Sequence, residues 1–238
     1  MIKKVFLIIV ILNLLTGCIA MSKQTMSDVT ISKSDKRGTI KIYNWLNKNF
    51  GKELKEATKN TPFSVSLLSA IVMQESGYYL LGNNRIDSID IDILLKNCIL
   101  DATGEVHGTR SAFPRNTDEF RRKYGDKITD ELIAEANRAR EFRGYKQPKQ
   151  WVYAGYGLFQ FDLQEIQSKQ HKEFFLKKQW YSFDKILEKV MIELQEKYKK
   201  SKGDLWKSIR LYNGSGNRAI RYANLVFAYK KIIEQNNQ

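Results

Sequence analysis

The chain has 238 residues, of which 42% are hydrophobic and 28% are charged. These values are ordinary for a globular protein and allow one well-cored domain, or at most two small ones. The formal net charge of +14 predicts an anionic partner, such as nucleic acid, anionic lipid or an acidic polymer of a bacterial cell wall. Nucleic acid is disfavoured because the chain has no arginine-rich block and no known nucleic-acid-binding motif.

The N-terminal stretch MIKKVFLIIVILNLLTGC predicts export from the cytoplasm. Lys3 and Lys4 precede an apolar run over residues 5–15. This run is far shorter than the ~20 residues of a membrane span, but it fits the core of a signal peptide. The following LTGC resembles a bacterial lipobox, whose cysteine is lipidated after cleavage in front of it.

From this resemblance we expect residues 1–17 to be removed and Cys18 to carry lipid. The lipid would anchor the protein in the cell envelope, on the periplasmic side of the outer membrane if the cell has two membranes. Residues 18–38 are predicted to be the lipidated cysteine and a flexible tether, because they are polar and show no periodicity. An ordinary secretory signal beside a chance cysteine is the alternative.

No metal or other cofactor is expected. With Cys18 lipidated, Cys98 has no disulfide partner, and its apolar neighbourhood LLKNCIL indicates a buried side chain rather than a nucleophile. His107 and His171 lie far apart in the sequence and have no CxxC or HExxH companion.

Residues 39–238 predict a mainly α domain. A first helix has an apolar face formed by Ile42, Trp45, Leu46 and Phe50. Thr61 and Pro62 predict the start of a second helix, which is apolar nearly all round and is therefore expected to be buried. Gly77 is placed to stop it.

The middle of the chain, residues 82–150, is less regular. Alternation of isoleucine and aspartate over residues 89–93 suggests a short strand, and LDATGEVH suggests a hairpin turn. Residues 129–143 predict an amphipathic helix.

Three further helices are predicted after residue 180. Ser182 is placed to cap one, Asp204 is placed to cap the next, and Gly214 is placed to end that second helix. Residues 217–236 form the last one. The predicted fold class is mainly α, with a small β element in the middle.

Glu75 is the first candidate for chemistry. It lies at the predicted C-terminal end of the apolar helix, where desolvation and the negative end of the helix dipole both raise the pKa of a carboxyl. A carboxyl that stays protonated near neutral pH is what a general acid requires. A solvated glutamate at a helix end is the alternative.

Three short stretches occur in order on this helical chain: QESG at 74–77, GLFQ at 157–160 and RLYNGSG at 210–216. Together they resemble the lysozyme-like superfamily of soluble lytic transglycosylases and goose-type lysozymes. That family has a Glu-Ser pair, then Gly-Leu-Met-Gln, then Ala-Tyr-Asn followed by glycine. The resemblance covers roughly residues 45–80 and 155–235.

The resemblance implies a lysozyme-like fold with Glu75 as the catalytic acid. It also implies that Ser76, Gln160, Tyr212 and Asn213 line the site, with Tyr212 near Glu75. The expected reaction is cleavage of the β-1,4 bond between N-acetylmuramic acid and N-acetylglucosamine in peptidoglycan, by a lytic transglycosylase. A goose-type hydrolase is the alternative.

The stretch GYGLFQFD, residues 155–162, is consistent with a glycan groove. Backbone that comes close to sugar rings is expected at Gly155, Gly157, Gly214 and Gly216. Flat faces for the sugars are expected from Tyr156, Phe159 and Tyr212, and hydrogen bonds to them from Gln160 and Asn213. Core packing is the alternative for the aromatic residues, above all for Phe159.

The chain departs from the family pattern in three places. Residues 82–150 form a long insertion, Phe159 replaces the methionine and Leu211 replaces the alanine. We expect the insertion to form one wall of the groove, because it connects two segments that both line the site. Its basic residues would then contact stem-peptide carboxylates, or simply form a solvated face: Arg110, Arg115, Arg121, Arg122 and Lys123.

Asp162 matches an aspartate that helps to hold a water molecule in goose-type lysozymes. An inverting hydrolase needs such a second carboxylate about 6.5–9.5 Å from the acid. Asp162 can instead cap the segment that follows it.

Two alternative functions also remain. One is a catalytically inactive lipoprotein that only binds glycan or scaffolds an envelope machine. The other is an enzyme that cleaves another N-acetylhexosamine polymer, such as chitin.

Overall fold

The structure is a computed structural model that describes residues 29–102 and 110–237. The predicted signal peptide, Cys18 and His107 lie outside the described residues. In chain order the elements are α2 (Lys33–Thr58), α3 (Val65–Leu81), η1 (Gly82–Asn84), α4 (Arg85–Ser88), α5 (Ile91–Asn97), β1 (Ile99–Ala102), α6 (Thr117–Tyr124), α7 (Asp126–Phe142), β2 (Tyr153–Tyr156), β3 (Phe161–Asp162), η2 (Leu163–Gln167), α8 (Lys169–Leu176), η3 (Gln179–Tyr181), α9 (Phe183–Lys200), α10 (Leu205–Asn213) and α11 (Gly216–Asn236). The described protein is mainly α, as predicted.

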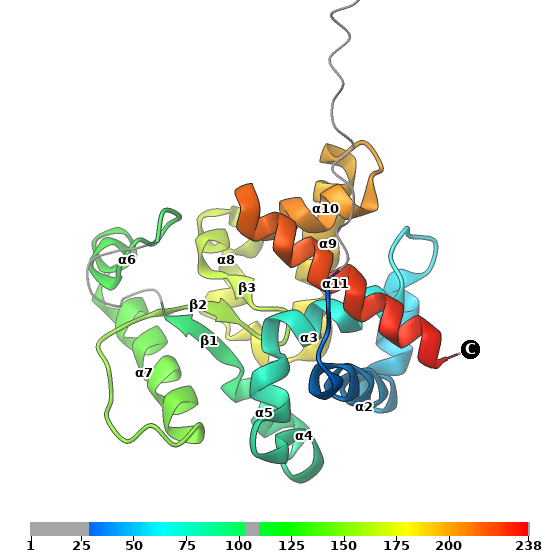
Figure 1. The fold of residues 1–238 in the computed structure, drawn as a ribbon. Helices are drawn as coiled ribbons and strands as arrows, with labels where there is room; N and C mark the ends of the chain where they lie inside the picture. The colour runs from blue at the N-terminus through cyan, green and yellow to red at the C-terminus, as the bar shows by residue number, and fades with distance from the viewer. Residues whose placement is uncertain (1–28, 103–109, 238) are drawn as a thin grey trace, which may run out of the picture.

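Helix α3 is central (Figure 1), and α2 and α11 both pack against it. Its sequence is apolar on all sides, which fits a helix covered by neighbours all round. The strands and α7 lie on the other side of α3 from α2 and α11 in Figure 1. One hydrophobic core extends from Ile42 in α2 to Ile233 in α11 and includes Leu94 and Phe120 of the middle segment. The described residues of the 82–150 segment therefore share the core of the surrounding chain.

The small β element is a three-stranded antiparallel sheet in the order β1-β2-β3. In its register, Tyr156 of β2 faces Ile99 of β1 on one side and Phe161 of β3 on the other. The GYGLFQFD stretch thus crosses from one strand to the next through a tight turn.

Helix α2 begins earlier than predicted. Residues 33–38 were expected to belong to a tether, but the helix begins at Lys33. Ser32 is its N-cap, and the Ser32 hydroxyl oxygen accepts a hydrogen bond from the Asp35 backbone N–H at 3.0 Å. The polar composition of this turn reflects capping rather than a lack of structure.

Both predicted ends of α3 were wrong. The helix begins after Ser64, whose side chain accepts from Leu67 N at 3.1 Å, and not at Thr61 and Pro62. Gly77 does not stop it. A Cβ at Gly77 would lie 2.8 Å from Met73 Sδ of the same helix, so this glycine leaves room for the Met73 side chain. The same Cβ would lie at ordinary contact distance from Ile42 of α2.

The strand predicted over residues 89–93 was also wrong, because helix α5 begins at Ile91. The Asp90 carboxylate accepts hydrogen bonds from Asp92 N and Ile93 N, which makes it an N-cap. Local capping outweighs the alternation of polar and apolar residues. The predicted hairpin turn lies mostly outside the described residues.

The remaining helices agree with the sequence. Helix α7 contains the predicted amphipathic segment, and Asp204 caps α10 by accepting from Lys207 N at 2.9 Å. Gly214 ends α10. Helix α9 begins after Ser182, although the Ser182 side chain makes no capping hydrogen bond. Among residues 29–102 and 110–237, no helix is both long enough and apolar enough to cross a membrane.

Candidate active site

A cleft of about 490 Å³ lies among α3, the sheet, α9 and the end of α10. Of the predicted site residues, those that line it are Glu75, Gln160, Asp162, Tyr212 and Asn213. Ser76, Tyr156 and Gly157 do not line it. The three separated sequence stretches therefore do meet in one place, although not every residue in them faces the cleft.

Glu75 lies inside α3 rather than at its end, since the helix continues to Leu81. The Tyr222 hydroxyl of α11 donates a hydrogen bond to Glu75 Oε1 at 2.5 Å. Burial raises the pKa of the Glu75 carboxyl to about 8, and the Tyr222 hydrogen bond offsets this only in part. Desolvation, and not the helix end, is thus what keeps the carboxyl protonated near neutral pH.

The turn after β2 is held to the helices by hydrogen bonds to its carbonyl groups. Ser76 Oγ donates to Leu158 O at 2.8 Å, and Tyr212 Oη donates to Phe159 O at 3.1 Å. Ser76 is fully buried. The expectation that Ser76 lines the site is therefore corrected: it fixes the turn behind Glu75.

The glycines of this turn serve close packing within the protein. A Cβ at Gly155 would lie 2.2 Å from Gln160 Oε1, so Gly155 lets the Gln160 side chain fold over the strand. Gly157 has φ +74°, and a Cβ there would lie 3.0 Å from Ile186 Cγ1 of α9. Gly155 lines the cleft, whereas Gly157 does not.

Tyr156 is a core residue and not a sugar platform. It is fully buried, and its ring packs edge-on against Trp180 and Phe175, with centroid distances of 4.7 and 5.3 Å. Phe159 is also fully buried. Of the three aromatic residues expected to face sugar, Tyr212 alone lines the cleft.

Asp162 does cap the segment that follows it, because Asp162 Oδ1 accepts from Gln164 N at 2.8 Å. Both of its carboxylate oxygens also accept from the Arg110 guanidinium. This ion pair joins the middle segment to the cleft wall. Asp162 is therefore held by two partners while it faces the cleft.

Two other basic residues of the predicted set form ion pairs away from the cleft. Arg115 pairs with Glu119, and Arg121 pairs with Asp126 and Asp130. The neighbouring aromatic residues pack together as a cluster: Phe113, Phe120 and Tyr124. Arg110 is the predicted cation that contacts a residue of the cleft.

Glu193 of α9 is a cleft residue that the sequence did not reveal. Its side chain is 17% exposed and lies 3.5 Å from Lys197, one turn later. Burial raises the pKa of the Glu193 carboxyl to about 7. In the sequence it appears as one more polar residue beside the apolar face of α9, so nothing distinguishes it. Tyr222 was likewise not identified as the partner of Glu75.

Cys98 and the histidines are the residues at which no metal site was predicted. Cys98 is buried, and burial raises the pKa of its thiol. His171 is buried against the Phe161 ring. Within the described part of the chain, no three His, Cys, Asp or Glu residues are grouped so that they would hold a metal ion.

Comparisons with protein-family models, curated proteins and solved structures return no match for this chain. A carboxyl that is protonated near pH 7 faces a polar cleft beside the groups of Gln160, Tyr212 and Asn213. Such a carboxyl can donate a proton to a leaving oxygen and later take one back.

Proposed function

We propose that the protein is a lysozyme-like enzyme that cleaves the β-1,4 bond between N-acetylmuramic acid and N-acetylglucosamine in peptidoglycan. The observation that carries the proposal is Glu75, whose pKa is raised to about 8 in a cleft lined mainly by polar groups. A carboxyl in this state is the general acid that glycosidic bond cleavage requires. The sequence resemblance places the catalytic glutamate at the same residue.

The cleft supplies the remaining needs of a glycan site. Its volume of about 490 Å³ falls within the range of ordinary ligand sites. Gln160 and Asn213 offer amides to hydroxyl and acetamido groups, and the Tyr78 ring, 66% exposed, offers an apolar face at the rim. Tyr222 orients the Glu75 carboxyl through its hydrogen bond to Oε1.

We favour a lytic transglycosylase. Glu75 donates its proton to the glycosidic oxygen as the bond to C1 of the muramyl residue breaks. The muramyl 6-hydroxyl then attacks C1 and gives its proton to the Glu75 carboxylate, which closes a 1,6-anhydro ring and restores the acid. One carboxyl suffices, because the nucleophile belongs to the substrate.

A hydrolase is the second candidate, because three further carboxylates line the same cleft: Asp101, Asp162 and Glu193. One of them would position the attacking water. Asp162 is held by an ion pair with Arg110 and by a hydrogen bond from Gln164 N. Within the described residues, the one ion pair of Glu193 is with the flexible amine of Lys197. If water is the nucleophile, Glu193 is the better placed of the two.

Asp162→Asn and Glu193→Gln separate these two routes. In a lytic transglycosylase each variant should keep at least about a tenth of the activity of the folded wild type, because neither carboxylate takes part in proton transfer. The measurement is the rate of muropeptide release from purified sacculi, with the folded fraction determined by circular dichroism. Near-complete loss in one variant, together with reducing muramic acid ends in the wild-type products, would identify a hydrolase and its second carboxylate.

The proposed location is the cell envelope, with the chain anchored through lipid on Cys18. Cys18→Ala should then move the protein from the membrane fraction to the soluble fraction after a high-salt wash, because the acyl chains are lost. Immunoblots of the two fractions measure this. Membrane association that survives both the substitution and the wash would mean that another anchor holds the protein.

A further inference from the structure

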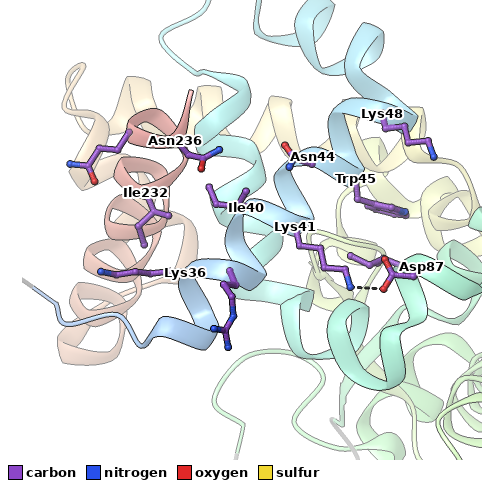
Figure 2. A pocket seen from close by; sticks show the side chains of 12 residues that line it. Lys36, Ile40, Lys41, Asn44, Trp45, Lys48, Asp87, Ile232 and Asn236 are labelled. Atoms are coloured by element: carbon purple, nitrogen blue, oxygen red, sulfur yellow. Dashed lines mark hydrogen bonds and ion pairs between the residues drawn. The ribbon is translucent and has the colours of Figure 1, made fainter. Parts of the chain in front are cut away.

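A groove lies away from the cleft, between α2, α4 and α11. This groove has a volume of about 970 Å³. Its floor is apolar and includes Ile40 and Trp45 of α2 and Ile232 of α11, and Figure 2 shows Ile40 and Ile232 on these neighbouring helices. Nothing in the proposed reaction uses it.

The rim of the groove is strongly basic. Lys36, Arg37, Lys41 and Lys48 line it, and Asp87 is the acidic residue among its lining (Figure 2). Asp87 pairs with Lys41. The other three cations are exposed and have no ion pair within residues 29–102 and 110–237. Helix α2 as a whole contains seven Lys or Arg residues and three Asp or Glu residues.

A second, smaller hollow continues the groove. It has a volume of about 310 Å³ and shares Lys36, Ile232 and Gln235 with the groove. Val29, the first described residue, lines this hollow. The expected lipid on Cys18 is therefore joined to this face by at most about 40 Å of chain.

We infer that the groove between α2 and α11 binds anionic phospholipid and holds this face of the protein against the membrane surface. A basic rim over an apolar floor matches the two parts of that molecule: the cations neutralise the phosphate, and Ile40 and Ile232 contact the upper acyl chain. Both parts lie on the face from which the chain runs toward its expected membrane attachment. This inference does not depend on the proposed cleavage of peptidoglycan.

The test uses the full chain carrying Cys18→Ala, so that acyl chains do not contribute. Its partition onto vesicles of phosphatidylcholine with 30 mol% phosphatidylglycerol is divided by its partition onto phosphatidylcholine alone. This ratio cancels any binding by the apolar N-terminal run. The groove variant is Lys36→Gln with Arg37→Gln, and the matched control is Lys127→Gln with Lys146→Gln, which removes the same charge near α7, on the opposite side of the molecule in Figure 1.

The groove variant should lower the ratio by about 30-fold, because each Lys or Arg near an anionic surface contributes about fivefold. The control should lower it less than about threefold, because its charges lie beyond the screening length. Ile232→Gln should lower partition onto the anionic vesicles about fivefold at unchanged charge. Equal effects of the two charge variants, or a wild-type ratio near one, would overturn the inference.

Discussion

Replacing Glu75 by glutamine is expected to lower the rate of muropeptide release from purified sacculi by about 1000-fold, since a general acid contributes roughly 10²- to 10⁴-fold. The amide keeps the size of the side chain and an oxygen that accepts from Tyr222, but it has no proton to donate. The measurement is dye release from labelled sacculi. Glu141→Gln, an identical substitution at an exposed residue of α7, should keep full activity. Equal rates for wild type and Glu75→Gln would mean that Glu75 is not the acid.

The same substitution should stabilise the fold at high pH. The pKa of Glu75 is about 8 in the folded protein and near 4.5 in the unfolded chain, so the folded state binds more protons between these values. The stabilisation from protonated Glu75 is therefore complete below about pH 4.5 and is lost as the pH rises through 8. At pH 9 the free energy of unfolding of Glu75→Gln should exceed that of wild type by up to about 5 kcal/mol, because each pKa unit corresponds to about 1.4 kcal/mol, and at pH 4.5 the two should be close. Thermal melts at the two pH values measure this. A difference that does not change with pH would contradict a half-buried Glu75 that is protonated in the folded protein. The activity of the wild type should fall above pH 8.

The second large effect concerns the packing beneath the cleft. Trp180 is fully buried and packs against Tyr156 and Phe174. Trp180→Ala should lower the free energy of unfolding by about 3–5 kcal/mol, because it removes a large buried ring and leaves a cavity. For a chain of this size the melting temperature should fall by about 10 °C.

Tyr78→Ala is the matched control, because it removes an aromatic ring that is 66% exposed. Its melting temperature should stay within a degree or two of the wild type. If the two variants melt together, the aromatic residues of GYGLFQFD do not pack in the core as described.

The sequence predicted the helices well where capping and apolar periodicity agree. Asp204 and Gly214 mark both ends of α10, and the apolar face of α9 identifies that helix although Ser182 makes no capping bond. It failed where a residue serves a distant contact. Gly77 was predicted to end α3, but it is a helical glycine that faces Met73 of its own helix and Ile42 of α2, and no local pattern reports the contact with α2.

The candidate site was predictable only in part for the same reason. Glu75, Gln160 and Tyr212 belong to short recognisable stretches, and all three line the cleft. Tyr156 belongs to such a stretch as well, yet its side chain is fully buried, because both faces of β2 are covered and its ring packs against Trp180 and Phe175. Glu193 became visible only once α9 was placed beside the cleft.

The most direct test of the central claim is mass spectrometry of the products released from purified sacculi by the wild-type protein and by Glu75→Gln. We expect muropeptides with 1,6-anhydro muramyl ends from the wild type and almost none from the variant. Reducing muramic acid ends would keep Glu75 as the acid but make the enzyme a hydrolase. No soluble muropeptide from the wild type, or equal amounts from both proteins, would contradict the claim that this cleft cleaves peptidoglycan.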